Sequence, residues 1–239
     1  MQYGIQLYSV KEEITDAKSL VKALETLKAQ GYTSVEFAGY QGMPASELKA
    51  ELDRVGMKAY STHVSVDALS NHLEETLQYA KTLGLQYVAL AFSKTESKEQ
   101  VMGTVEVLKN AVEKAKEYGL TILYHNHAHE FEMVDGILPI DMFKAVCDLE
   151  LDVFWSFAAG YDTCAYMRDN CDKIKLLHIK DGCKATRVPC GLGKGENDIF
   201  AIIQQAQALG HTSVIVENES ENPMDFNDSL SSINYLQQK

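Results

Sequence analysis

The sequence lacks several features that would place it in common functional classes. Its 239 residues include five cysteines but no C-x-x-C pair, so neither a disulfide framework nor a zinc knuckle is predicted. No apolar run approaches the roughly 20 residues that a membrane-spanning helix needs. Lysine and arginine number 22 against 34 aspartates and glutamates, which leaves a net charge of −12. That balance argues against nucleic acid or an anionic membrane as a partner, because both attract clustered cations.

The remaining composition is typical of a soluble cytoplasmic protein that handles a small molecule. Unpaired cysteines indicate a reducing compartment, and strand-like sequence from Tyr3 onward leaves no room for a signal peptide. Apolar residues make up 46% of the chain, which is ample for a core. We expect a neutral or metal-chelating small molecule as the partner. The sequence leaves the oligomeric state open, a homo-oligomer included.

One phrase recurs along the chain: the end of a helical pattern, a glycine, and an apolar strand that closes in polar residues. Glycine just past a helix adopts the left-handed cap that other residues resist, so each instance marks a helix-to-strand corner. The glycines are Gly31, Gly56, Gly84, Gly119 and Gly210. Eight strands are predicted, at 3–10, 33–38, 58–63, 86–92, 120–126, 151–157, 174–180 and 212–218.

Helical stretches alternate with these strands, among them 15–30, 70–83, 98–118, 139–146, 164–170, 198–209 and 228–238. This alternation, without a break in composition, predicts an α/β fold in which residues 1–239 form one closed (β/α)₈ TIM barrel. The rival is an open doubly wound sheet, which would carry a glycine-rich phosphate turn after its first strand. The segment there, Tyr8 to Glu12, contains no glycine.

Histidines concentrate in the segment ILYHNHAHEF, residues 122–131. His125, His127 and His129 stand at two-residue spacing with Glu130 beside them. Side chains at i and i+2 share a face of a strand, so His125 and His127 should point the same way at the end of a buried strand. Such a position suits a metal ligand or a proton carrier.

In a TIM barrel, functional residues lie at the carboxyl ends of the strands. Mixed imidazole and carboxylate ligands favour Mn²⁺, Co²⁺, Zn²⁺ or Fe²⁺ over Ca²⁺ or Mg²⁺. We therefore predict a divalent metal, of unspecified identity, held by one residue from each of the last four strands. Bound to an α-hydroxy carbonyl, it would stabilise an enediolate. Each of these four strands ends in a possible metal ligand, and the strand ends together carry Glu36, His63, His125, His127, Asp152, His178, Lys180, Glu217 and Glu219.

The chain resembles the xylose-isomerase-like barrel family of sugar isomerases and epimerases, which also includes inosose dehydratases. The likeness rests on GIQLYSV, SVEFAGY, YHNHAHEF, LDVFW, LLHIKDG, GLGKGENDIF and VIVENE in chain order. It implies a metal-dependent sugar isomerase or epimerase of carbohydrate metabolism that works by proton transfer next to a carbonyl. Asp152, His178 and Glu217 match the family's last three metal ligands.

Two positions depart from that family pattern. The first ligand of typical sugar epimerases is a glutamate that is also a catalytic base, and His125 stands in its place. Either His125 binds the metal while Glu130 or His127 supplies the base, or the site is altered and metal-free. Trp155 stands where epimerases often have a substrate-contacting histidine. The resulting assignment makes Glu217, Glu130 and His127 catalytic, and it gives substrate contacts to His63, Trp155, Lys180, Glu36 and Tyr8.

Several alternatives remain open at this stage. A dehydratase or lyase acting on a keto-inositol or 3-keto-sugar would use the same enolate, and a sugar-binding barrel would have lost catalysis. A phosphodiester nuclease on this scaffold would need more histidine and aspartate ligands and a basic groove. The run Gly191, Gly193 and Gly195 is read as a flexible loop over the site rather than a phosphate cradle. Phe37 is a candidate wall for a sugar face.

Overall fold

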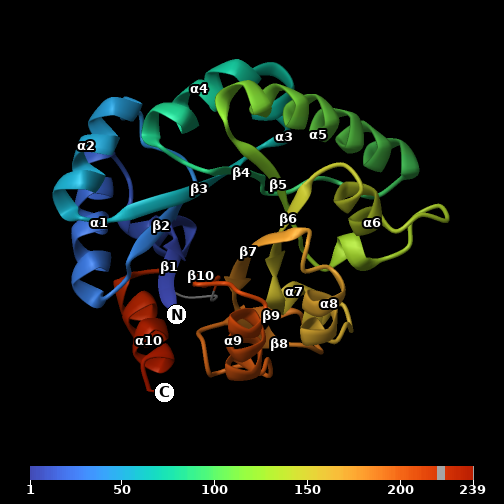
Figure 1. The fold of residues 1–239 in the computed structure, drawn as a ribbon. Helices are drawn as coiled ribbons and strands as arrows, with labels where there is room; N and C mark the ends of the chain where they lie inside the picture. The colour runs from blue at the N-terminus through green and yellow to red at the C-terminus, as the bar shows by residue number, and fades with distance from the viewer. Residues whose placement is uncertain (220–223, 239) are drawn as a thin grey trace.

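Eight parallel strands close into a barrel in the computed structural model, which describes residues 1–219 and 224–238. Each strand pairs with its neighbours along the chain, and the last barrel strand pairs with the first, so the predicted (β/α)₈ TIM barrel is confirmed (Figure 1). The strands are β1 Gln2–Gln6, β2 Ser34–Phe37, β3 Lys58–Val64, β4 Tyr87–Leu90, β5 Thr121–His125, β6 Asp148–Asp152, β7 Ile174–Ile179 and β10 Ser213–Val216.

Helices surround the barrel and cover its outer face (Figure 1). Glycines in the left-handed conformation follow α1, α2, α4 and α5, as the recurring phrase predicted. No helix within 1–219 and 224–238 is long and apolar enough to cross a membrane. The helices are α1 Ala17–Gln30, α2 Ala45–Val55, α3 Val66–Asn71, α4 Leu73–Leu83, α5 Lys98–Tyr118, α6 Pro139–Lys144, α7 Val153–Ala158, α8 Thr163–Asp169, α9 Ile199–Ala208 and α10 Phe226–Leu236.

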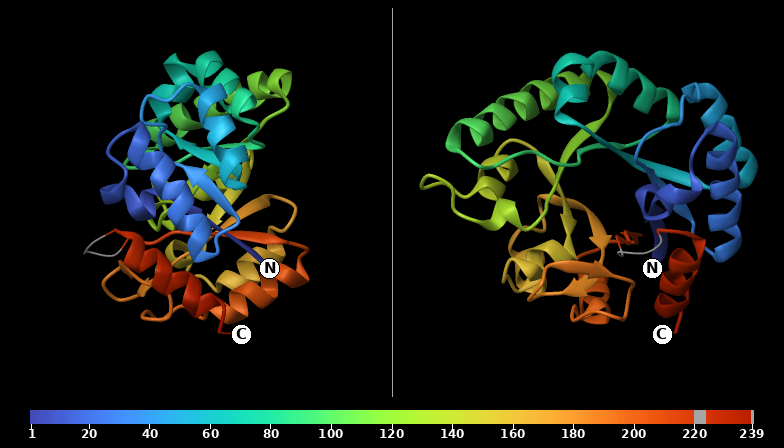
Figure 2. Two further views of the ribbon diagram at one scale, coloured as in Figure 1. Left: turned by 90° about the vertical axis from the view of Figure 1, so that its left-hand side faces the viewer. Right: turned by 180° about the vertical axis from the view of Figure 1, so that it is seen from behind.

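The two ends of the chain meet where the barrel closes. Helix α10 lies beside α1, as both views in Figure 2 show. The Tyr32 hydroxyl donates a hydrogen bond of 2.8 Å to the Ser229 carbonyl, and Gln30 Nε2 donates one of 2.8 Å to the Phe226 carbonyl. These bonds hold the last helix against the first βα unit, and β10 completes the ring beside β1.

The sixth strand lies earlier than the sequence suggested. The apolar run was assigned to a strand at 151–157, but β6 ends at Asp152 and the run forms α7. Asp152 Oδ1 accepts hydrogen bonds from the backbone N–H groups of Phe154 and Trp155, at 2.9 and 3.0 Å, and so caps that helix. The first strand is likewise shorter, because Leu7–Glu13 forms the 3₁₀ helix η1.

The barrel interior has an apolar layer and a polar layer. Alternation along the strands turns Ala89, Leu123, Leu176 and Ile215 inward, where they form a cluster separate from the main core. Two residues further along three of these strands stand His125, His178 and Glu217. The apolar cluster therefore forms a packed floor, and the polar side chains collect above it at the carboxyl end.

The glycine-rich segment after β7 encloses a carboxylate of the protein itself. It follows the hairpin of β8 Asp181–Cys183 and β9 Val188–Cys190, which the sequence did not predict. Asp181 accepts backbone hydrogen bonds of 2.8 to 3.1 Å from Gly182, Gly193, Gly195 and Asn197. A Cβ at Gly195 would lie 2.1 Å from Asp181 Oδ1. These N–H groups are therefore occupied and do not form a phosphate cradle.

Candidate metal centre

Four buried side chains from consecutive barrel strands converge at the carboxyl end of the barrel. His125 ends β5, Asp152 ends β6, His178 lies near the end of β7, and Glu217 follows β10. One ligand atom of each lies within 4.8 Å of those of the other three. The structure thus brings together the four residues that the sequence proposed as metal ligands, and their two nitrogens and two oxygens are a donor set that suits a transition metal.

Asp152 directs one oxygen toward this centre. Its Oδ1 is used by the helix cap, whereas Oδ2 is buried without a hydrogen-bond partner and lies 3.7 Å from Lys180 Nζ. Burial raises the pKa of Asp152, and the charge of Lys180 offsets part of that effect. Burial of a carboxylate oxygen without a hydrogen-bond partner costs free energy unless a cation binds to it. This atom therefore fits a metal ligand.

Each of the two histidines faces the centre with one ring nitrogen and a carboxylate with the other. His178 Nδ1 lies 3.1 Å from Glu217 Oε2, while its Nε2 lies 2.7 Å from Glu36 Oε1. His125 Nδ1 lies 3.2 Å from Glu150 Oε2, and its Nε2 lies 4.0 Å from Glu217 Oε2. A carboxylate behind a ligating imidazole fixes its tautomer and orientation.

Glu150 is the main residue that sequence reasoning missed. Its Oε2 lies 2.6 Å from His63 Nε2, and its Oε1 lies 3.3 Å from His178 Nε2. Burial alone would raise the pKa of Glu150, but the neighbouring imidazoles of His178 and His63 outweigh it and hold the pKa well below its usual range. Glu150 and Asp152 share the inner face of β6, so the alternation DLELD could have revealed both had the strand been placed correctly.

Glu36 forms the second carboxylate of this lower layer. It accepts hydrogen bonds from Gln6 Nε2, at 2.6 Å, and from the Ser61 hydroxyl, and it lies 3.0 Å from His63 Nε2. Burial would lower the pKa of His63, but the charges of Glu36 and Glu150 raise it to about 10. His63 is therefore protonated at neutral pH in the metal-free protein and neutralises part of the buried negative charge.

Lys180 and Glu217 form a buried ion pair, of which Glu217 lines the cavity described below and Lys180 does not. Lys180 Nζ lies 3.3 Å from Glu217 Oε2 and also binds Glu219. Burial would raise the pKa of Glu217, but Lys180 and His178 hold it well below its usual range. The Glu217 carboxylate is therefore ionised, which both metal ligation and proton abstraction require.

A cavity of about 530 Å³ opens over this group. His127 lines it, and burial and the charges of His125 and Lys180 lower the pKa of His127 to about 2. The His127 ring is neutral, and its buried Nδ1 has no hydrogen-bond partner. The cavity is lined by Tyr8, Ala38, Gly39, His63, Val64, Ser65, Ala91, Phe92, His125, His127, Glu217 and Glu219.

Other predicted site residues occupy supporting positions. Glu130 is buried away from the cavity: its carboxylate accepts hydrogen bonds from the Tyr124 hydroxyl, at 2.8 Å, and from the His127 backbone N–H, at 2.7 Å. Glu36 lies in the lower layer and does not line the cavity. Through its bond to the His127 N–H, Glu130 orients the loop that carries His127.

Trp155 is half-buried beside Lys180, whose Nζ lies 5.2 Å from the indole ring centroid.

Of the two aromatic residues Tyr8 and Phe37, both predicted to form a wall for a sugar, only one lines the cavity. Tyr8 lines the cavity from η1 and accepts a hydrogen bond of 2.9 Å from Lys11 Nζ. Phe37 is fully buried, and its ring centroid lies 5.4 Å from that of Tyr40 in the main core. Its neighbour Glu36 points into the barrel, so strand alternation turns Phe37 outward. Phe37 therefore does not form a wall of the cavity.

Comparison with known proteins agrees with this architecture. Residues 24–238 match the family model described as a xylose isomerase-like TIM barrel. The chain belongs to the xylose isomerase-like TIM-barrel family. No curated protein matches its sequence.

Several solved structures show the same fold at low sequence identity to this chain. A sugar phosphate isomerase/epimerase from Parabacteroides distasonis has a TM-score of 0.84 and 22% identity, over 99% of this chain and 93% of that one. The probable 3-DHS dehydratase AsbF from Bacillus anthracis has a TM-score of 0.80 and 13% identity, over 100% of both chains. The IolI protein with a bound zinc atom has a TM-score of 0.75 and 17% identity, over 99% and 96%.

Proposed function

We propose that this protein is a metal-dependent isomerase or epimerase of a keto sugar or related polyol. The observation that carries the proposal is the convergence of His125, Asp152, His178 and Glu217 within 4.8 Å beside an open cavity. Proteins of similar fold include one solved with a bound zinc atom and one described as a sugar phosphate isomerase/epimerase, which supports this proposal. A bound divalent ion would polarise a substrate carbonyl and stabilise negative charge on its oxygen.

The residues around the cavity have defined tasks in this proposal. Glu217 is ionised and lines the cavity, so it removes the proton from the carbon next to the carbonyl. Lys180, 3.3 Å from Glu217, keeps that carboxylate charged and restricts its orientation. His127 presents a neutral ring toward the cavity, where it can form a hydrogen bond with a substrate oxygen. Phe92 and Tyr8 add aromatic rings to the cavity wall.

A dehydratase acting on a keto sugar or keto-inositol is the second candidate. An epimerase needs a base on each face of the reacting carbon, and here Glu130 is hydrogen-bonded away from the cavity. The cavity therefore offers the Glu217 carboxylate and, from another strand, the His127 imidazole. A single carboxylate suits an elimination, in which Glu217 removes the proton next to the carbonyl and, once protonated, returns it to the departing hydroxyl so that water leaves.

Incubation with candidate ketoses and Mn²⁺ in D₂O tests the proposal and separates the two reactions. An isomerase or epimerase is expected to incorporate one solvent deuteron at the carbon next to the carbonyl and to yield an isomer of unchanged formula, observed by NMR and mass spectrometry. A dehydratase is expected to yield a product lighter by one water.

The metal-free protein, prepared by chelation, serves as the control for solvent exchange. Its exchange should fall to background and return when Mn²⁺ is added. Absence of both exchange and water loss across free and phosphorylated ketoses and keto-inositols would contradict an enolising enzyme. It would leave the sugar-binding barrel as the better description.

A further inference from the structure

A second cavity of about 430 Å³ adjoins the proposed substrate pocket. Phe92, in the loop after β4, lines both cavities and so forms the partition between them. The second cavity lies between this loop and the loop from β5 to α6. Its lining consists of Phe92, Lys94, Thr95, Glu96, His129, Glu132, Met133 and Val134.

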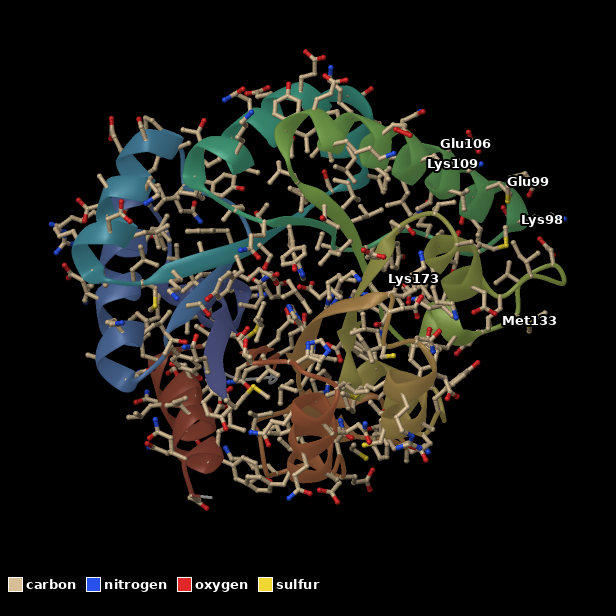
Figure 3. All side chains as sticks on the ribbon, in the orientation of Figure 1. Lys98, Glu99, Glu106, Lys109, Met133 and Lys173 are labelled. Carbon is tan, nitrogen blue, oxygen red and sulfur yellow. The ribbon has the colours of Figure 1, made fainter. Side chains whose placement is uncertain are left out.

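Two large apolar side chains of this cavity are exposed to solvent. The side chain of Phe92 is 51% exposed and that of Met133 is 66% exposed, the two highest values among the exposed large hydrophobic residues of the described chain. Met133 lies at the edge of the molecule, on the loop between β5 and α6 (Figure 3). Solvent exposure of apolar area in a concave site is unfavourable in isolation and typical of a surface that receives an apolar group.

Met133 is held in place by an anchored hairpin. Val134 and Ile137 pair through two backbone hydrogen bonds of 2.9 Å, around a turn in which Asp135 and Gly136 have positive φ. The Asp135 carboxylate accepts a hydrogen bond of 3.0 Å from the backbone N–H of Lys98 at the start of α5. This rigid support means that the exposed position of Met133 is built into the fold.

The loop is also tied to the segment that follows β7. Glu132, next to Met133, forms an ion pair of 2.7 Å with Arg187 in the β8–β9 hairpin. Exposed ion pairs of this kind contribute little to stability, so this pair mainly positions the two loops relative to each other. It fixes Glu132 in the wall of the cavity beside Met133.

Aromatic rings lead from the proposed reaction site to this cavity. The Phe92 ring centroid lies 5.6 Å from that of His127, which lines the pocket, and 5.1 Å from that of His129, which lines the second cavity. His129 Nε2 lies 3.0 Å from the Ser93 carbonyl, which fixes the ring. A ligand that extends beyond the pocket therefore meets a continuous aromatic surface.

We propose that this second cavity is a binding subsite for an apolar or aromatic group attached to the sugar. The substrate would then be a keto-glycoside, with the ring that carries the ketone beside Glu217 and the apolar substituent in the cavity lined by Phe92 and Met133. Only the position of the sugar beside Glu217 rests on the proposed function. The cavity's concave shape and its continuity with the pocket through Phe92 favour part of the substrate as its occupant over a second copy of the chain.

Two unreactive ligands test the subsite. Methyl β-D-glucopyranoside and 4-nitrophenyl β-D-glucopyranoside differ in the substituent and can be titrated by calorimetry into the Mn²⁺-loaded protein. The 4-nitrophenyl compound is expected to bind at least about tenfold more tightly, which corresponds to about 1.4 kcal/mol. In the Met133→Ser/Val134→Ser variant, whose two positions line the second cavity but not the substrate pocket, this preference should fall below about threefold, while the affinity for the methyl compound stays unchanged.

Leu230→Ser is the matched control, because Leu230 is an exposed apolar residue, 40% exposed, on α10. It should retain the full preference. The single variant Met133→Gln, with a folded circular dichroism spectrum, gives an intermediate preference if the double variant does not fold. Equal affinity for both glycosides, or a preference that survives in the double variant, would refute the subsite.

Self-association is the competing outcome for this surface. Sedimentation equilibrium that shows a wild-type dimer abolished by the double variant would assign Met133 and Val134 to an interface and also refute the subsite. Failure of the proposed function is distinguishable: free 4-nitrophenol, titrated alone and followed by NMR, should still shift the Phe92 and Met133 resonances in a protein that catalyses no solvent exchange.

Discussion

Replacement of Glu217 by glutamine is expected to lower kcat/KM by about 10²–10⁴-fold, the range typical of losing a general base. Glutamine keeps the size of the side chain but removes the charge that Lys180 and His178 stabilise. The same charge would balance a bound cation. The rate of deuterium exchange, with whichever ketose or keto-inositol the wild-type protein labels, measures the effect.

Glu219→Gln is the matched control for that substitution. Glu219 also binds Lys180 and lines the cavity, but it lies outside the group of converging ligand atoms. Its replacement should reduce kcat/KM by less than about tenfold, since the Glu217 carboxylate remains. Equal losses in the two variants, or an active Glu217→Gln protein, would assign the base to another residue.

Replacement of Glu150 by glutamine is expected to weaken metal binding by about 10- to 100-fold, although Glu150 would not touch the ion. Its carboxylate lies behind both His125 and His178 and helps to fix which nitrogen of each ring faces the centre. The variant also leaves His63 with fewer charged partners, and breaking a buried ion pair costs about 3–5 kcal/mol. Chelator competition measures the affinity, and urea denaturation of the metal-free protein measures the free energy of unfolding.

Histidine tautomers provide a readout that a purely structural role would not change. In the Zn²⁺-loaded wild-type protein, ¹⁵N-edited NMR should show His125 protonated at Nδ1 and His178 protonated at Nε2, the nitrogens that face carboxylates. The Glu150→Gln variant should lose this fixed pattern at His125. Glu130→Gln is the control, since that buried carboxylate contacts neither ring. An unchanged metal affinity in Glu150→Gln would contradict the positioning role.

The fold was predictable because each βα unit carries its own local signals. Glycines such as Gly31 and Gly84 mark the corners, and the strand alternation places His178 and Glu217 on the inner face. The boundary of β6 was not predictable in the same way, since the apolar run after Asp152 suits a buried strand as well as a buried helix. The cap that Asp152 forms on α7 decides between them.

The structure brings the four predicted ligands together, whereas the layer beneath them differs from the sequence prediction. Placing the sixth strand at 151 hid Glu150, whose inward orientation depends on the true start of β6. Glu36 was expected at the rim, but three polar partners and complete burial place it beneath the histidines. Depth within a barrel follows from strand tilt and stagger, which the sequence does not state. The position of a side chain along the barrel axis is therefore harder to predict than whether it points into or out of the barrel.

The most direct test of the account is the location and stoichiometry of a bound metal. Crystals of the protein loaded with Mn²⁺ or Zn²⁺ should show one anomalous scatterer per chain, about 2.0–2.2 Å from its ligands. The expected ligand atoms are His125 Nε2, Asp152 Oδ2, His178 Nδ1 and a Glu217 oxygen. A loaded protein that retains no ion, or that binds it elsewhere while His178 and Glu217 stay paired with each other, would contradict the account.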